Sequence, residues 1–199
     1  MTPAFREEAA RIVARYPTSR SAMMPLLYLA QAEDGGVTRE GMQRVAEVLG
    51  LTTAEVEGVV TFYTMYQRPP CGAYVLSVCT NLSCALAGGR RLFEVALEEL
   101  GEEAHRGVSE DGMITLHEEE CLAACDAAPV VQVNFTNYDR VDEDGIRGLI
   151  AALRRGEPPA PARGPAPETL QATSRVLAGL GGPADVVRPP RQSEGEGGG

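Results

Sequence analysis

Four cysteines stand in two pairs, and they are the residues of this sequence best suited to do chemistry. Cys79 and Cys84 have four residues between them and follow a segment that reads as a strand. Cys121 and Cys125 have three residues between them and come just before another segment of strand character. Because loops at strand ends are held by a rigid sheet, the two pairs can meet at one place. Such a set could hold a zinc ion or an iron–sulfur cluster, form two disulfides, or have no joint role.

The sequence context favours a metal centre over disulfides. The N-terminal segment carries acidic residues and lacks the apolar stretch of a signal peptide, so we expect a reducing compartment. Paired thiols in that setting hold metal more often than they form disulfides. Structural zinc prefers tighter pairs, whereas wider spacing suits a [2Fe–2S] cluster with one pair on each iron. Since both metals accept four thiolates, spacing alone leaves zinc open.

The composition argues against several classes of partner. The 199 residues are 44% hydrophobic, enough to bury a core, and carry a formal net charge of −10. An acidic chain is a poor ligand for nucleic acid or for an anionic membrane surface. Residues 37–60 resemble a helix-turn-helix DNA reader, but Glu55 and Glu57 would repel phosphates there. No stretch approaches the roughly 18 uninterrupted apolar residues of a membrane span, so we expect no direct membrane insertion.

The elements that must position the thiols fall into three regions of an α/β protein. Residues 1–68 carry apolar residues at helical spacing and predict a helical bundle, with Phe62 and Tyr63 in its core. Residues 72–155 have the order strand, helix, strand, strand, helix, which predicts a thioredoxin-like sandwich. Residues 156–199 are rich in Pro and Gly, so we expect a disordered or extended tail. The apolar residues of this tail, which could dock on a partner, are Val176, Leu177, Leu180, Val186 and Val187.

The cysteine pairs and their flanks resemble those of a known family. Cys79-x4-Cys84 with Cys121-x3-Cys125, the latter running into "DAAPVVQVN", is similar to the NuoE family, the small [2Fe–2S] subunit of the NADH-oxidising module of respiratory complex I. The upstream segments "ARYPTSRSAMMPLLYLAQAEDG" and "EVEGVVTFYTMYQ" share the resemblance. It implies a thioredoxin-like [2Fe–2S] ferredoxin domain with one [2Fe–2S] cluster, whose ligands are Cys79, Cys84, Cys121 and Cys125. Cys71 falls outside the motif and reads as an incidental thiol at the domain junction.

The resemblance also implies where such a chain works. In the family, FMN and NADH are bound by a larger partner subunit, and a large iron–sulfur subunit belongs to the same module. The sequence itself contains no dinucleotide fingerprint or P-loop. His105 and His117 have no nucleophile partnered to them and read as exposed or capping residues. We therefore expect an electron carrier within an enzyme, NADH:quinone oxidoreductase, with no complete active site of its own.

The expected location is the cytoplasmic side of the plasma membrane, as a peripheral part of a membrane complex. Equivalent diaphorase subunits serve NAD-linked formate dehydrogenases and hydrogenases, which makes these complexes the nearest alternative. From a different class, the chain could be a zinc-stabilised adaptor that binds partners without redox work. A third alternative is a free-standing ferredoxin, but in such a protein the helical bundle would have no function.

Charges near the cysteines could tune a cluster. The acidic run 118–120 and Asp126 flank the second pair and would disfavour an added electron, although a solvated surface is the alternative explanation. The helix that opens at Gly88–Gly89 could point its positive end toward the site. Pro129 stands where thioredoxin-like folds often carry a cis-proline, so a cis bond is one hypothesis for this position and a plain strand-starting proline is the other.

Overall fold

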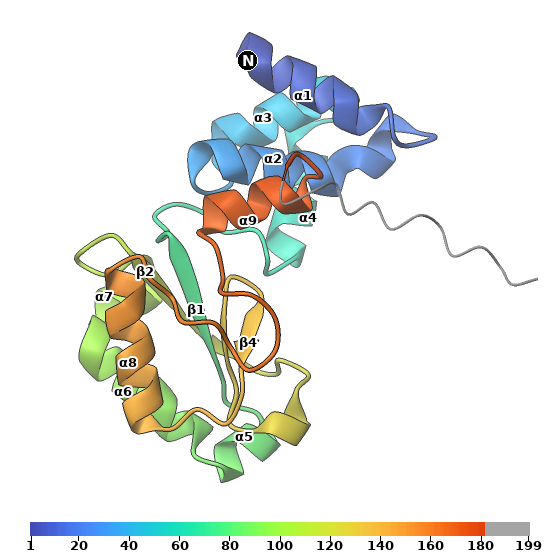
Figure 1. Ribbon diagram of the computed structural model, residues 1–199. Coiled ribbons are helices and arrows are strands. Elements are labelled where there is room, and N and C mark those ends of the chain that lie inside the picture. The colour runs from blue at the N-terminus through green and yellow to red at the C-terminus, as the bar shows by residue number, and fades with distance from the viewer. Residues whose placement is uncertain (182–199) are drawn as a thin grey trace, which may run out of the picture.

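The chain folds into a helical bundle joined to a mixed α/β part, and the computed structural model describes residues 1–181 (Figure 1). The bundle contains α1 (Pro3–Val13), the 3-10 helix η1 (Ser19–Ala22), α2 (Met23–Asp34), α3 (Arg39–Leu49) and α4 (Thr53–Phe62). The α/β part follows as β1 (Tyr74–Cys79), α5 (Leu82–Leu86), α6 (Gly89–Leu100), α7 (Glu102–Arg106), β2 (Ile114–Glu119), η2 (Cys125–Ala127), β3 (Val131–Val133), β4 (Thr136–Tyr138) and α8 (Glu143–Arg154). A last helix, α9 (Leu170–Leu177), follows an irregular stretch. None of these helices is long and apolar enough to cross a bilayer.

Polar caps fix the ends of the bundle helices. The Thr38 hydroxyl accepts the backbone N–H of Gly41 at 2.9 Å, and α3 stops at Gly50, whose φ of 67° is left-handed. At the start of α4, Thr52 and Glu55 form a reciprocal capping box. Each cap satisfies a backbone donor that the helix itself leaves unpaired and contributes about 1 kcal/mol. The bundle helices therefore begin and end where short local signals place them.

The sheet has the strand order β2-β1-β3-β4, with one apolar face. β1 and β2 are parallel, whereas β1–β3 and β3–β4 are antiparallel. Tyr74, Leu76 and Val78 of β1 face a core that α6 and α8 cover from one side (Figure 1). The alternate residues of β1, among them Ser77 and Cys79, face the other side. This arrangement is the thioredoxin-like α/β order that the sequence predicts.

A tight turn joins β3 to β4. Val133 pairs with Thr136, so only Asn134 and Phe135 lie between the strands. Both have positive φ values, 44° and 72°, as a two-residue turn of the primed type requires. Asparagine tolerates this conformation, whereas a phenylalanine in it is unusual. Asn134 also accepts the N–H of Val75 at 2.9 Å, which fastens the turn to β1.

The C-terminal segment does not stay extended to its end. Residues 157–169 form neither helix nor strand, in line with the expected extended tail, but α9 is a helix that packs against α2. Leu170 and Leu180 are buried, and Leu180 belongs to the hydrophobic core of the bundle. Val176 and Leu177 remain 48% and 44% exposed, and Val186 and Val187 lie outside the described residues.

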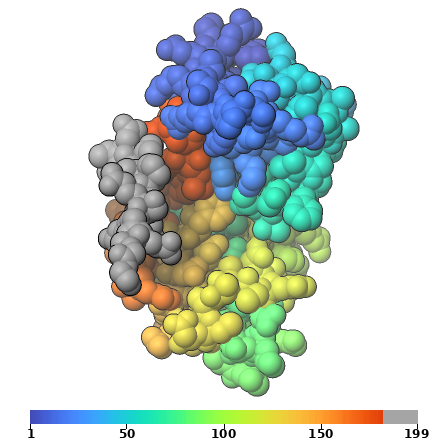
Figure 2. All heavy atoms as spheres, turned by 90° about the vertical axis from the view of Figure 1, so that its right-hand side faces the viewer, coloured from blue at the N-terminus to red at the C-terminus, as the bar shows by residue number. Residues whose placement is uncertain are grey.

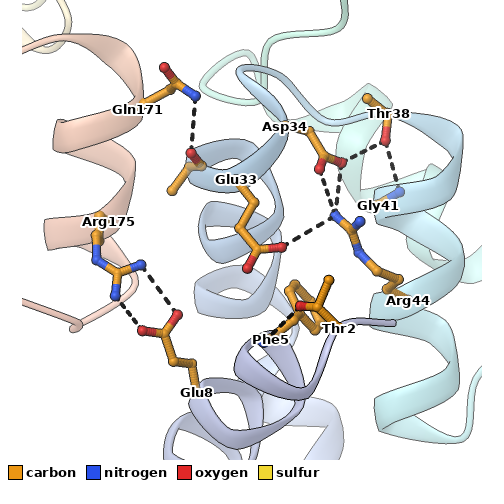
Figure 3. Close-up of polar contacts among 11 residues, drawn as sticks. Thr2, Phe5, Glu8, Glu33, Asp34, Thr38, Gly41, Arg44, Gln171 and Arg175 are labelled. Atoms are coloured by element: carbon orange, nitrogen blue, oxygen red, sulfur yellow. Dashed lines mark hydrogen bonds and ion pairs between the residues drawn. The ribbon is translucent and has the colours of Figure 1, made fainter.

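Polar contacts fasten α9 to the bundle (Figure 3). Arg175 forms an ion pair with Glu8 of α1, and Gln171 donates to the carbonyl oxygen of Ala32 at 3.2 Å. A fully buried residue, Gln31, donates from its amide nitrogen to the hydroxyl of Ser174 at 2.9 Å. Its amide oxygen accepts the backbone N–H of Gln67, in the linker to the α/β part, at 2.7 Å. Gln31 thus connects α2, α9 and the linker.

Before reaching the bundle, the same segment is tied to the α/β part. Tyr138 donates to the carbonyl oxygen of Pro159 at 2.6 Å, and Asn134 donates to that of Glu168 at 2.8 Å. The N–H of Leu170 donates to the carbonyl oxygen of Ala73 at 2.7 Å. Figure 2 shows the red-orange end of the chain against the blue helices of the bundle. We call residues 157–181 the C-terminal strap, because they are bonded to both parts.

Two aromatic residues of α4 differ from their expected place in the core. Phe62 is 76% exposed and Tyr63 is 37% exposed, with the rings in edge contact at 4.9 Å. Val56 and Val60 form the buried stripe of α4. Phe62 is the last residue of the helix and lies two positions after Val60, about 200° around the helix axis, so it faces away from the core.

Candidate metal centre

The first cysteine pair is buried at the end of β1. Cys79 is the last residue of that strand, and Cys84 lies in the short helix α5, which Asn81 caps by accepting the N–H of Leu82 at 2.9 Å. The two side chains are in contact and pack in a small apolar cluster with Ala127 and Val130. Burial raises the pKa of the Cys84 thiol, and the neighbouring Cys79 and Cys125 add to the rise. α5 lies at the end of the sheet opposite to the bundle (Figure 1).

The start of α6 rests directly on the backbone of this pair. A Cβ atom on Gly89 would lie 2.5 Å from the carbonyl oxygen of Cys79 and 2.9 Å from that of Cys84. Only glycine allows so close an approach of helix and loop. The positive end of the α6 dipole consequently lies beside the first pair, where it favours negative charge on the thiolates.

The second pair lies on the loop between β2 and β3. Cys121 and Cys125 are both exposed, and the Cys121 sulfur accepts the N–H of Ala123 at 3.3 Å. The sulfur of Cys79 lies 3.9 Å from the carbonyl oxygen of Glu120, so this loop passes close to the first pair. The bond between Ala128 and Pro129 is cis, which is one of the two possibilities that the sequence left open.

The structure brings together part of the predicted ligand set. Cys79 and Cys84 touch, and Cys125 is near enough to influence the Cys84 thiol. Cys121 stands on the exposed side of its loop and lines a separate cavity. Among residues 1–181, no three His, Cys, Asp or Glu side chains are grouped so that they could hold one metal ion.

The residues present fit a [2Fe–2S] cluster by their chemistry. Such a cluster needs four thiolates in all, and they come here as two pairs from neighbouring loops. One pair is enclosed by apolar side chains, which limits access of water to that side. Binding of metal requires the thiolate form, so the raised pKa of Cys84 means that iron would displace a proton there.

The charged and titratable residues near the cysteines differ in how deeply they are buried. Residues Glu118, Glu120 and Asp126 are exposed, whereas burial raises the pKa of half-buried Glu119. His105 is exposed as expected, and its Nδ1 donates to the carbonyl oxygen of Leu116 at 3.2 Å. His117 is instead half-buried on β2; burial, followed by the charge of His105, lowers its pKa.

Cys71 is outside the candidate site, as the motif predicts. Its sulfur donates to the carbonyl oxygen of Gly35 at 2.9 Å, and burial raises its pKa. The thiol therefore contacts the end of α2 at the junction between the bundle and the α/β part.

A polar row on the helix-free face of the sheet escaped sequence reasoning. Ser77 lies between His117 on β2 and Gln132 on β3, and all three line a cavity of about 240 Å³ that also contains Cys121. Strand alternation in "YVLSVC" and "ITLHEE" is the signal that could have shown it, because Ser77, Thr115 and His117 all stand at alternate positions that face away from the apolar core.

Comparison with known proteins assigns the chain to a family. A sequence model of the thioredoxin-like [2Fe-2S] ferredoxin family matches residues 9–154, a span that contains both cysteine pairs. The chain is 47% identical over 173 residues to the E subunit of NADH-quinone oxidoreductase from Mycobacterium tuberculosis, covering 87% of this chain and 68% of that protein. It is 41% identical over 147 residues to NADH-quinone oxidoreductase subunit 2 of Thermus thermophilus, covering 72% of this chain and 81% of that protein.

Among solved structures, an NAD+-reducing [NiFe]-hydrogenase in its H2-reduced state has a similar fold. The TM-score is 0.54 over 67% of this chain and 22% of the hydrogenase chain, with 19% sequence identity. At that identity the likeness concerns the fold alone. The family model and the sequence relatives cover most of the bundle together with the α/β part. The chain therefore belongs to the NuoE family of thioredoxin-like [2Fe–2S] ferredoxins, the family that includes these two NADH-quinone oxidoreductase subunits.

Proposed function

We propose that this chain is the electron-transfer subunit of an NADH:quinone oxidoreductase and carries one [2Fe–2S] cluster. Its ligands are Cys79, Cys84, Cys121 and Cys125, with one pair on each iron. The observation that carries the proposal is the contact between the buried Cys79 and Cys84, with Cys125 near enough to influence the Cys84 thiol, in a chain of this family. When bound, the cluster supplies one-electron chemistry at the end of the sheet.

The residues around the pairs have separate roles in this proposal. The cysteines lose their protons and act as ligands. Ala127 and Val130 keep water from the inner side, and the N-terminal end of α6 at Gly89 offsets the negative charge of the site. The exposed carboxylates of the second loop oppose an added electron and lower the reduction potential, an effect that salt screens.

The partners follow from the same assignment. FMN and NADH are bound by a partner subunit, with which this cluster exchanges single electrons, and the large iron–sulfur subunit completes the module. The complex is attached to the membrane at its cytoplasmic side, with this chain as a peripheral component. The names of the relatives in Mycobacterium tuberculosis and Thermus thermophilus support quinone as the acceptor of the complex. A diaphorase subunit of an NAD-linked hydrogenase or formate dehydrogenase is the second candidate within the redox class.

The first test is the iron and acid-labile sulfide content of anaerobically purified protein. We expect about two irons and about two sulfides per chain, with a spin-half EPR signal after dithionite reduction. Replacing Cys84 or Cys125 with Ser should abolish or weaken the signal, and the matched Cys71→Ser variant should leave it unchanged. Zinc without an EPR signal in protein never exposed to oxygen would instead identify a structural adaptor. Loss of the signal in Cys71→Ser with retention in Cys84→Ser would refute the ligand assignment.

A further inference from the structure

A second cavity, of about 220 Å³, lies at the junction between the bundle and the α/β part. Its walls come from the linker that includes Arg68, from α7 and the residue after it, and from β2. None of the four candidate cluster ligands lines it. The cavity therefore shares His117 and Gln67 with the cavity beside Cys121 but contains none of the candidate ligands.

Two guanidinium groups and two imidazoles surround this cavity. Arg68, Arg106, His105 and His117 all line it, and none of its lining residues is a carboxylate. The chain as a whole has 28 acidic and 18 basic residues, and its only two histidines are both in this set. A cationic cavity in so acidic a protein creates a local preference for anions.

The two guanidinium groups have little compensation from neighbouring carboxylates among the described residues. Arg68 forms no ion pair or hydrogen bond with any part of residues 1–181. Arg106 has Glu102 at 3.9 Å as its nearest ion-pair partner, with both side chains exposed, and such a pair contributes little. His117 has the Glu119 carboxylate at 3.8 Å. Both guanidinium groups can thus turn to a ligand at small cost.

The two imidazoles are held in place. His105 donates from Nδ1 to the carbonyl oxygen of Leu116 and packs edge-on against Phe93, with ring centroids 5.3 Å apart. His117 is fixed in β2 by pairing with Ser77. Burial, and after it the charge of His105, lowers the pKa of His117, and an anion in the cavity would oppose both effects.

We propose that this junction cavity binds a phosphate group, held chiefly by Arg68 and Arg106, with His105 and His117 as additional donors. Guanidinium groups match the oxygens of phosphate in a bidentate fork. The volume of about 220 Å³ is below the roughly 300–1,000 Å³ of sites that enclose drug-sized ligands, so a phosphate group fits and a whole nucleotide does not. The phosphate is either free or the terminal group of a nucleotide whose remainder stays outside.

Binding of phosphate would join two parts of the fold. Arg68 belongs to the linker after the bundle, whereas Arg106 belongs to α7 of the α/β part. An anion contacting both would stabilise their relative placement in addition to the C-terminal strap. This inference stands on the geometry of the junction and does not depend on the cluster.

The experiment uses the two histidines as probes in the full-length, cluster-containing protein. Inorganic phosphate replaces chloride at constant ionic strength while the imidazole C–H signals are followed by proton NMR, and adenosine monophosphate is titrated in a second arm. We expect both signals to shift with saturation in at least one arm. Saturation by phosphate alone identifies the free anion, and tighter binding of the nucleotide identifies a nucleotide phosphate as the source.

Variants distinguish a specific phosphate site from a general attraction of phosphate to positively charged residues. Arg106→Gln and the double variant with Arg68→Gln should bind at least about tenfold more weakly, as expected for loss of charged hydrogen bonds. Arg11→Gln, on the exposed side of α1, removes the same charge and should bind like the unmodified protein. Arg106 is 79% exposed, so its replacement leaves the fold intact. A linear shift without saturation, or equal weakening by Arg11→Gln, would overturn the proposal.

Discussion

Gly89 is the residue on which the geometry of the first cysteine pair most directly depends. Its missing side chain lets the first turn of α6 touch the carbonyl groups of Cys79 and Cys84. Real Cβ atoms are not found at the distances of 2.5 and 2.9 Å that a side chain here would impose. The backbone on both sides is fixed, by β1 and by the cap of α5, so the strain of a larger residue would fall on the cysteines.

We expect Gly89→Ala to lower the free energy of unfolding by about 1–3 kcal/mol and to reduce iron bound per chain, since overpacking shifts the ligand backbone. Iron content and thermal denaturation measure the two effects. Gly58→Ala is the matched control, because its Cβ would meet nothing within 4 Å and alanine favours an exposed helix by up to about 1 kcal/mol. Full iron content in Gly89→Ala would show that the close approach is dispensable.

His117 gives the protein a pH dependence with a definite sign. Burial keeps its pKa below the ordinary value of 6.5 in the folded state, whereas the unfolded chain regains that value. The unfolded state therefore binds more protons below about pH 6.5, and stability falls as the pH drops through that range. We expect a smaller loss of Tm between about pH 7.5 and about pH 5.5 in His117→Gln than in the unmodified protein. An equal loss in both proteins would exclude His117 as the cause.

At the scale of residues, the candidate ligands could be predicted because the members of each pair are close in the sequence. The spacing of Cys79-x4-Cys84 and Cys121-x3-Cys125, and their place at strand ends, could be read directly because ligands of one loop are close in the chain. Two other features could not be predicted from the sequence. They are the contact of Gly89 with Cys79 and the grouping of both histidines with Arg68 and Arg106 around one cavity. These depend on how distant elements pack, and no short pattern encodes that packing.

At the scale of elements, too, features encoded by local sequence signals could be predicted, whereas α9, which depends on packing between distant segments, could not. Helices α3 and α4 carry caps and apolar periodicity, and the sequence therefore predicts them. α9 is short and isolated in a Pro- and Gly-rich region, and its stability comes from packing on α2 rather than from its own propensity. The exposure of Phe62 was missed for a related reason, since apolar character alone does not say which side of a helix faces the core.

The Gln31–Ser174 contact should contribute measurably to the attachment of α9. Ser174→Ala removes one partner of a fully buried amide, which we expect to cost about 1–2 kcal/mol in the free energy of unfolding. Denaturation by urea, followed by circular dichroism, measures the change. Val176→Ala serves as the control on the same helix, because that side chain is 48% exposed. Equal effects of the two substitutions would indicate that burial of the polar pair is unimportant.

On the scale of the whole molecule, the C-terminal strap makes the bundle discontinuous in sequence. The sequence suggested a division into 1–68, 72–155 and 156–199, and we propose that the functional division groups 170–180 with the bundle. Ala178 and Leu180 share the core cluster of the N-terminal helices, while the sheet has a separate core. The strap therefore connects two hydrophobic cores that would otherwise be joined only through the linker.

Truncation after Gly156 should destabilise the bundle and leave the cluster of the α/β part in place. Removal of α9 exposes apolar surface of α2, so we expect a lower Tm for the bundle and weaker assembly with the flavin-bearing subunit. The EPR signal should persist, because the α/β part keeps all four candidate ligands. Truncation after Gly181 is the control and should change neither property. Loss of iron on truncation after Gly156 would show that the strap also supports the cluster domain.

The return of α9 to the bundle has a consequence for the order of folding. Gln31 and Ser174 are 143 residues apart, and Glu8 and Arg175 are 167 apart. During synthesis, the first helices leave the ribosome long before the helix that completes their core. The sheet and both cysteine pairs emerge in that interval, so the cluster domain can fold and acquire iron while the bundle is still open. We therefore expect the docking of α9 to come last, although the helices on which it docks are made first.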